Sequence, residues 1–271
     1  MLDQGYFDKV YYQFWKTDNA TSNVFAIHGL GGHCLWFENA ANTFNKNKIN
    51  FFSFDLPGFG QSKYPKGAVS SYKEWIQVSK KTLEDFLLNF NVKEPVFILG
   101  HSMGSLIAVL LSKNVKAHGW ILSVPGFEGY RKTWPLVDFV LPVLIRSTLR
   151  SKENVALPFG PELLTKNKQT QLLVKQDPLR VINIQTKTFL DVYSLALKAK
   201  RSPFFLEEPV LMLVAGKDMV CSNSAMDAFF EKIKSIDKVK IMYENSYHDL
   251  FLEDEIHQIA DDISEWIKKR T

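Results

Sequence analysis

The residues best suited to chemistry are Gly100-His101-Ser102-Met103-Gly104, a Gly-x-Ser-x-Gly sequence. The apolar run Val96–Leu99 precedes it, and residues 105–110, also mostly apolar, follow. Where this motif joins a strand to a helix, a sharp turn raises the serine hydroxyl above the sheet, and the glycines let strand and helix approach closely. This context predicts that Ser102 is a nucleophile and makes a chance pentapeptide the weaker explanation.

A serine hydroxyl needs an adjacent base, and the base needs an acid to orient it. Two later loops supply these residue types: Asp218 follows the apolar run Val210–Val214, and His248 follows Val239–Tyr243. The carboxyl ends of parallel strands lie at one edge of a sheet, so we expect both loops to converge on Ser102. We therefore predict Asp218 as the orienting acid and His248 as the base.

Other titratable residues fit these roles less well. Asp249 adjoins His248, but we expect its side chain to point elsewhere. His118 precedes a predicted strand, which places it at the wrong end of the sheet, and His257 lies within the last predicted helix. Three more histidines lie in loops near Ser102, and we expect them to line the site and make structural hydrogen bonds: His28, His33 and His101.

Acyl transfer also needs two N–H donors for the negative charge that develops on a carbonyl oxygen. One is the N–H that follows the nucleophile, here that of Met103. The glycine-rich loop His28-Gly29-Leu30-Gly31-Gly32 predicts the second, the N–H of Leu30. A phosphate-binding loop is the competing interpretation, but this sequence lacks both the dinucleotide spacing and a P-loop lysine–serine pair.

The elements that must position these residues follow an alternating pattern. Short apolar runs that end in glycine-bearing turns alternate with helical patterns, which predicts a mostly parallel sheet flanked by helices, an α/β fold. We expect an antiparallel hairpin over 6–15 at the sheet edge. We also expect a helix that starts with a capping box at Ser71–Glu74 and ends near Phe90, and a final helix over 253–268.

Residues 128–205 interrupt this alternation and contain no clear strand, so they predict a helical cap inserted into a core formed by 1–127 and 206–271. The apolar stretch Trp134–Ile145 is too short to span a membrane. Two interpretations stay open: it packs as cap core over the site, or it forms an acyl channel or a surface that enters lipid. The candidate lining residues are Phe127, Trp134, Phe139, Phe204 and Phe205.

Composition limits the partners. A net charge of +4 without a basic stripe argues against nucleic acid, although weak attraction to anionic lipid through the cap is compatible with it. The histidines lack metal-ligand spacing, so we expect no metal and no cofactor. Cys34 and Cys221 predict free thiols, although the sequence also allows a single bridge. No signal peptide or membrane-spanning run is visible, which predicts a soluble cytoplasmic protein; the oligomeric state is left open.

The motifs taken together resemble those of α/β hydrolases, and in particular the monoacylglycerol lipase and lysophospholipase branch. The similarity extends from Val10 to Trp266, and Asp177-Pro178-Leu179 resembles a recurrent feature of that branch. Gly32 departs from it, because the branch often carries glutamate there. The resemblance implies a Ser102–His248–Asp218 triad with Leu30 and Met103 as oxyanion donors. The matching motifs, in chain order, are His28–Gly31, Asp55–Ser62, Gly100–Gly104, Gly216–Asp218 and Tyr247–Asp249.

These expectations favour a carboxylic-ester hydrolase that works through an acyl-enzyme on a small-molecule ester with an apolar acyl group. Monoacylglycerols, lysophospholipids and small aryl or alkyl esters all fit this class. The same triad also serves thioesterases, acyltransferases, carbon–carbon hydrolases and aminopeptidases. A non-catalytic receptor on the same fold is the alternative from another class.

Overall fold

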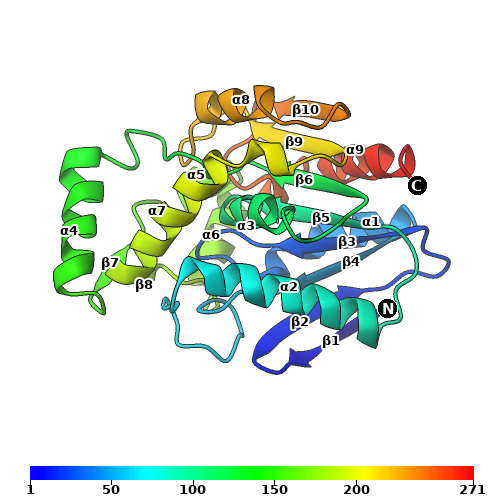
Figure 1. Ribbon diagram of the computed structural model, residues 1–271, viewed down its shortest axis with the longest axis horizontal. Coiled ribbons are helices and arrows are strands. Elements are labelled where there is room, and N and C mark those ends of the chain that lie inside the picture. Colours follow the sequence, from blue (N-terminus) through cyan, green and yellow to red (C-terminus); the bar gives the residue numbers. More distant parts are fainter.

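An eight-stranded sheet forms the centre of the computed structural model, which describes residues 1–271 (Figure 1). Its strand order is β1-β2-β4-β3-β5-β6-β9-β10. β2 runs antiparallel to both of its neighbours, and every other pair is parallel. The strands are β1 (Leu2–Phe7), β2 (Val10–Trp15), β3 (Ser22–Ile27), β4 (Ile49–Phe54), β5 (Val96–His101), β6 (Gly119–Ser123), β9 (Val210–Ala215) and β10 (Lys238–Tyr243).

Helices cover both faces of this sheet (Figure 1). On one face α2 (Tyr72–Asn89), α3 (Met103–Leu111) and α7 (Thr186–Lys200) pack against one another. On the other face α1 (Glu38–Lys46) packs against α9 (Ile256–Lys268). α8 (Asn223–Glu231) connects β9 to β10 and packs against β9. Because helices cover both faces, inner strands such as β3 and β9 are buried along their whole length rather than at alternate residues.

This architecture confirms the α/β-hydrolase fold expected from the sequence. Every apolar run that predicted a strand lies within one, and the expected hairpin is β1–β2 at the sheet edge. The start of α2 differs in detail. The Ser71 side chain accepts a hydrogen bond from the N–H of Lys73, but Glu74 accepts from the N–H of Ser70 (2.9 Å), so the reciprocal capping box does not form.

The chain between β6 and β9 leaves the sheet and forms α4 (Leu141–Leu149), α5 (Pro161–Leu164), α6 (Lys168–Gln176) and α7. The expectation that this segment lacks strands is wrong. β7 (Asn154–Ala156) and β8 (Asn183–Gln185) form a small antiparallel sheet. Each strand has three residues with one buried side chain, Val155 opposite Ile184, which is too short for a period of two to be visible.

Two glycines allow β5 and α3 to meet at a sharp angle. A Cβ on Gly104 would collide with the carbonyl oxygen of Ile27 in β3, and one on Gly100 would collide with the backbone of Gly104. Strand, turn and helix are therefore packed backbone to backbone at this point, with no room for a side chain between them.

We expect Gly104→Ala to lower the free energy of unfolding by about 3 kcal/mol, because the added methyl group must displace a backbone carbonyl in the buried sheet. Urea denaturation of the purified variant measures this. Gly126→Ala is the matched control, since a Cβ there would lie 3.7 Å from the nearest atom, an ordinary contact. Equal stability of the two variants would contradict this account of the junction.

Candidate active site

Ser102 lies between β5 and α3 in a strained backbone conformation. Its φ is +52° and its ψ is −112°, a region that residues with a side chain rarely adopt. Two hydrogen bonds hold this turn: the N–H of Ser102 donates to the carbonyl of Ser123 (2.8 Å), and the N–H of Ser105 donates to the carbonyl of Ser102 (3.1 Å). The sequence-predicted nucleophile is thus displayed at the carboxyl end of the central strand.

The loops after β9 and β10 bring Asp218 and His248 to this serine, as expected from their positions. The Nε2 atom of His248 lies 3.0 Å from the Oγ atom of Ser102, and its Nδ1 atom lies 2.8 Å from the Oδ2 atom of Asp218. Because Nδ1–H donates to the carboxylate, Nε2 is free to accept the serine proton. All three side chains are buried.

The electrostatic surroundings of His248 favour its charged form. Burial alone lowers the pKa of this imidazole, but the charge and hydrogen bond of Asp218, with the charge of Asp249, outweigh burial and raise it. The other oxygen of Asp218 accepts the N–H groups of Val220 and Cys221, both at 2.8 Å. These donors fix the carboxylate so that its Oδ2 atom faces the ring.

Asp249 is bonded to His101 and not to a member of the triad. Its carboxylate lies 3.3 Å from the Nε2 atom of His101, and the Nδ1 atom of His101 lies 3.2 Å from the hydroxyl of Ser123. Although burial acts against it, the pKa of Asp249 is lowered, chiefly by His101. A second buried His–Asp pair therefore lies beside the triad, with the two imidazole rings 5.6 Å apart.

The glycine-rich loop lies directly against the elbow. A Cβ on Gly29 would lie 3.1 Å from the Cβ atom of Ser102. The carbonyl of Gly29 accepts hydrogen bonds from His28 Nδ1 (2.8 Å) and from the N–H of Gly32 (3.3 Å). In a trans peptide the N–H points opposite to the C=O, so the Leu30 N–H points away from these partners. Neither it nor the Met103 N–H donates to another protein group.

The remaining histidines have structural partners. His28 Nε2 accepts the N–H of Leu56 (3.0 Å), and burial lowers the pKa of His28 to about 4, so the ring is neutral. His33 binds Asp177, 2.7 Å away in the segment between β6 and β9. His118 accepts the N–H of Val96 at the amino end of the sheet. His257, in α9, lies 2.7 Å from the hydroxyl of Thr43.

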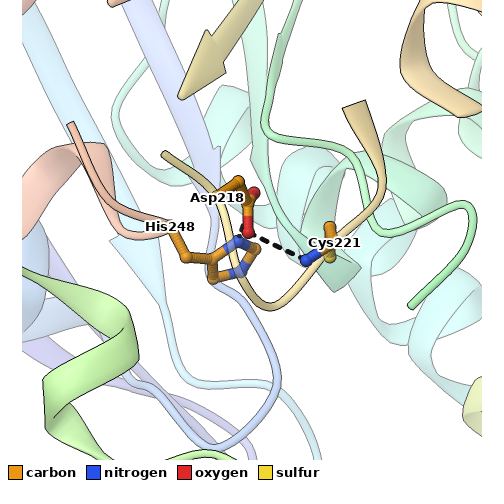
Figure 2. A group of neighbouring side chains, drawn as sticks. All are labelled: Asp218, Cys221 and His248. Carbon is orange, nitrogen blue, oxygen red and sulfur yellow. Dashed lines mark hydrogen bonds and ion pairs between the residues drawn. The ribbon is translucent and has the colours of Figure 1, made fainter. Parts of the chain in front are cut away.

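The two cysteines are free and buried, which settles the alternative of a single bridge. Cys221 lies beside Asp218 and His248 (Figure 2). Its Sγ atom, a carboxylate oxygen of Asp218 and a ring nitrogen of His248 lie within 4.8 Å of one another, close enough to be considered as metal ligands. Burial, with the charge of Asp218, raises the pKa of the Cys221 thiol despite a hydrogen bond to Ser102. The Cys221 thiol is therefore protonated. The Asp218 carboxylate and the His248 imidazole are hydrogen-bonded to each other.

A cavity of about 610 Å³ opens beside Ser102. Its lining is mostly apolar and comes from the elbow, from the loop after β6 and from α7. Three charged side chains also line it: Glu128, Arg131 and Lys200. Lys200 forms an ion pair with Glu128 at 2.6 Å. The apolar lining includes Leu30, Met103, Leu106, Phe127, Trp134, Leu136, Val140, Phe159, Phe189, Val192, Tyr193, Ala196, Leu197 and Val220.

Sequence reasoning identified only part of this lining. Phe127 and Trp134 line the cavity, but Phe139 packs behind Trp134, and Phe204 and Phe205 lie outside the lining. The main omission is α7, where Phe189 and five later residues face the cavity at helical spacing. That stripe was visible as a pattern of i, i+3 and i+4 positions. The stretch 134–145 has parts of both expected roles, packing over the site and an apolar channel or surface. Trp134 and Val140 line the cavity, whereas other apolar side chains of the stretch are exposed.

Comparison with known proteins agrees with this geometry. A family model described as Serine aminopeptidase, S33 matches residues 18–255. The chain is 26% identical to the monoglyceride lipase of Rattus norvegicus, over 95% of this chain and 86% of that one. It is 25% identical to a phospholipase of Bacillus subtilis, over 89% of this chain and 93% of the other.

Solved structures share the fold. A soluble variant of the monoglyceride lipase of Saccharomyces cerevisiae, in complex with a substrate analogue, superposes with a TM-score of 0.88 at 21% identity, covering 100% of this chain and 96% of that one. The monoacylglycerol lipase of Paleococcus ferrophilus gives 0.84 at 23% identity, covering 97% and 99%. The chain therefore belongs to the Serine aminopeptidase, S33 family and is a serine hydrolase of the α/β-hydrolase fold, similar to the monoacylglycerol lipase branch.

Proposed function

We propose that this protein hydrolyses lipid-like carboxylic esters through an acyl-enzyme at Ser102. Ser102 Oγ attacks the ester carbonyl carbon while its proton passes to Nε2 of His248, and the N–H groups of Leu30 and Met103 bind the oxyanion. Collapse of this intermediate expels the alcohol, which takes the proton from His248. His248 then activates a water molecule that releases the carboxylic acid and regenerates Ser102.

The observation that carries this proposal is the continuous chain of hydrogen bonds Asp218–His248–Ser102, with distances of 2.8 and 3.0 Å. Each member has the partner that its role requires. Asp218 fixes the tautomer of His248, and His248 approaches the serine hydroxyl with its unprotonated nitrogen. A ligand-binding receptor would not need this alignment.

The cavity supports a substrate with an apolar acyl group. Its walls beside Ser102 are aliphatic and aromatic, so burial of a hydrocarbon chain would supply most of the binding free energy. Relatives named monoglyceride lipase and phospholipase agree with monoacylglycerols and lysophospholipids as the substrate class. In this proposal residues 128–205 act as the cap that covers the acyl chain.

The family description also raises the cleavage of amides by an aminopeptidase. Such an enzyme must bind a free α-ammonium group close to the nucleophile, which calls for an unpaired carboxylate in the cavity. The cavity has one acid besides the triad, Glu128, and it is paired with Lys200. This pairing favours the ester proposal over the amide alternative.

Membrane contact through the cap is a further part of this proposal. No helix of the structure is both long and apolar enough to cross a bilayer. However, α4 carries an exposed apolar stripe at four-residue spacing, Leu141, Ile145 and Leu149, and Figure 1 shows α4 at the end of the molecule far from the sheet. Arg146, Arg150 and Lys152, on α4 and directly after it, are exposed and would favour anionic lipid, although Arg146 and Arg150 also pair with Glu153.

We expect Ser102→Ala to lose about 10⁴–10⁶-fold in turnover of a p-nitrophenyl acyl ester and to lose labelling by a fluorophosphonate, with the fold retained. Cys221→Ser serves as the control for a competing nucleophile beside the site and should keep most of the activity. Undiminished hydrolysis by Ser102→Ala would disprove the assignment.

We expect the acid limb of the kcat/KM profile to report His248, because the base must be neutral to accept the serine proton. Asp249 raises the pKa of His248, so Asp249→Asn should lower that pKa and move the acid limb to lower pH. Rates measured from pH 5 to 9 test this. Asp227→Asn, whose native carboxylate pairs with Lys240 at the surface, is the control and should not move the limb.

We expect the double variant Leu141→Asp/Ile145→Asp to bind less to vesicles of phosphatidylcholine and phosphatidylglycerol, because charge on the stripe opposes entry into lipid. Its rate on a water-soluble butyrate ester should stay near that of the wild type, since neither side chain lines the cavity. Cosedimentation gives the readout. Unchanged vesicle binding would remove α4 as the contact.

A further inference from the structure

A short segment of the proposed cap, residues 177–181, lies on the loop that carries Leu30. The carbonyl of Gly31 accepts the N–H of Val181 at 3.0 Å. Gly31 has φ of +81°, and a Cβ there would lie 2.8 Å from the carbonyl oxygen of Val181. The loop is therefore held between two surfaces, with the elbow on one side, at Gly29, and the cap segment on the other.

Asp177 is the side chain that joins this segment to the loop. Its Oδ2 atom accepts hydrogen bonds from Nε2 of His33 (2.7 Å) and Nε1 of Trp36 (2.8 Å). Its Oδ1 atom accepts the N–H of Leu179 (2.9 Å), which fixes the carboxylate against its own backbone. Burial opposes ionisation, but these hydrogen bonds, of which the one from His33 has the largest effect, lower the pKa of Asp177 to about 2. The carboxylate is therefore charged throughout the neutral range.

The identity of residue 32 fits this arrangement. A Cβ on Gly32 would lie 3.0 Å from the ring of Trp36, closer than nearly all real contacts. Glycine thus leaves the indole in place to donate to Asp177. The acid that binds this loop therefore comes from the proposed cap, 141 residues beyond Trp36.

We propose that Asp177 is a positioning residue, which holds the oxyanion loop in the geometry that lets the Leu30 N–H bind the reacting oxygen. This inference rests on the proposed acyl-enzyme function. Asp177 does not touch substrate; it acts through His33, Trp36 and the Gly31–Val181 contact. Seating of the cap and assembly of the oxyanion site are then one event, because a displaced cap releases the loop.

Asp191 on α7 provides a matched control. It is a buried carboxylate of the proposed cap, whereas Asp177 is half-buried, and like Asp177 it binds the core. It accepts the N–H of Tyr72 at 3.0 Å and pairs with Lys187 at 2.6 Å. No hydrogen bond joins it to residues 28–36. Its removal breaks a polar contact between the proposed cap and the core and leaves the contacts of the oxyanion loop in place.

The experiment compares Asp177→Ala and Asp191→Ala in the full chain, with thermal melting to measure folding. Two ligands separate the roles: an acyl trifluoromethyl ketone, whose adduct with Ser102 places an oxyanion in the hole, and a fatty alcohol of equal length, which only fills the cavity. We expect Asp177→Ala to lose about 10–100-fold in kcat and in ketone affinity, with alcohol affinity and KM changed less than about threefold. Asp191→Ala should stay near the wild type in all four.

Equal losses for the two variants, or for the two ligands, would overturn the inference, because either would indicate general loosening of the cap. If Asp177→Ala does not fold, Trp36→Phe removes a single bond of the tether and should shift the same ratio of ketone to alcohol affinity by a smaller factor; an unchanged ratio would overturn it. An active Ser102→Ala would instead reject the acyl-enzyme function itself, so the two failures are distinguishable.

Discussion

The strained backbone of Ser102 is the constraint on which the other features depend. A serine held at positive φ between a buried strand and a buried helix is stable only because the surrounding structure determines it completely. Three features hold this turn in place: the hydrogen bond to Ser123, the hydrogen bond from Ser105, and the close contact of Gly104 with β3. Every other group of the site is arranged around the direction in which that turn aims the hydroxyl.

The structure must also accommodate buried charge, because the carboxylates of Asp218 and Asp249 both lie near the imidazole of His248. An unpaired buried carboxylate would be costly, so each needs its own compensation. Asp218 has two backbone donors and His248, whereas Asp249 has His101 and the N–H of Phe251. His101, which precedes the nucleophile in sequence, thus makes structural contacts with Asp249 and Ser123, as expected, but it does not line the cavity.

The segment between β6 and β9 follows different rules from the core. Its long helix α7 lines the cavity, whereas α4 leaves apolar side chains exposed. Its contacts with the core combine apolar packing, mainly of α7 against α3 and α2, with polar contacts that include those of Asp177 and Asp191. The segment is therefore joined to the core through α7, while α4 leaves its apolar stripe exposed.

Much of the core was predictable because each inner strand is buried on both faces and reads as an uninterrupted apolar run. The capping interaction of Ser71 was predictable in type, but the partner of Glu74 depends on the path of the preceding loop. β7 and β8 could not be recognised, since one buried residue per strand gives no period. The prediction that Phe204 and Phe205 line the cavity was wrong, because apolar character alone does not show which surface a side chain packs against.

The sequence by itself determined the elbow, the order of serine, acid and histidine, and the glycine loop. These are local requirements of backbone geometry that only particular residues at fixed spacing can meet. Only the tertiary structure decided that Asp249 faces His101, that α7 lines the cavity, and that Asp177 meets His33 and Trp36 across more than 140 residues. Such pairings depend on how loops and inserted helices return to the sheet, because packing of the whole chain sets those paths and no local pattern records them.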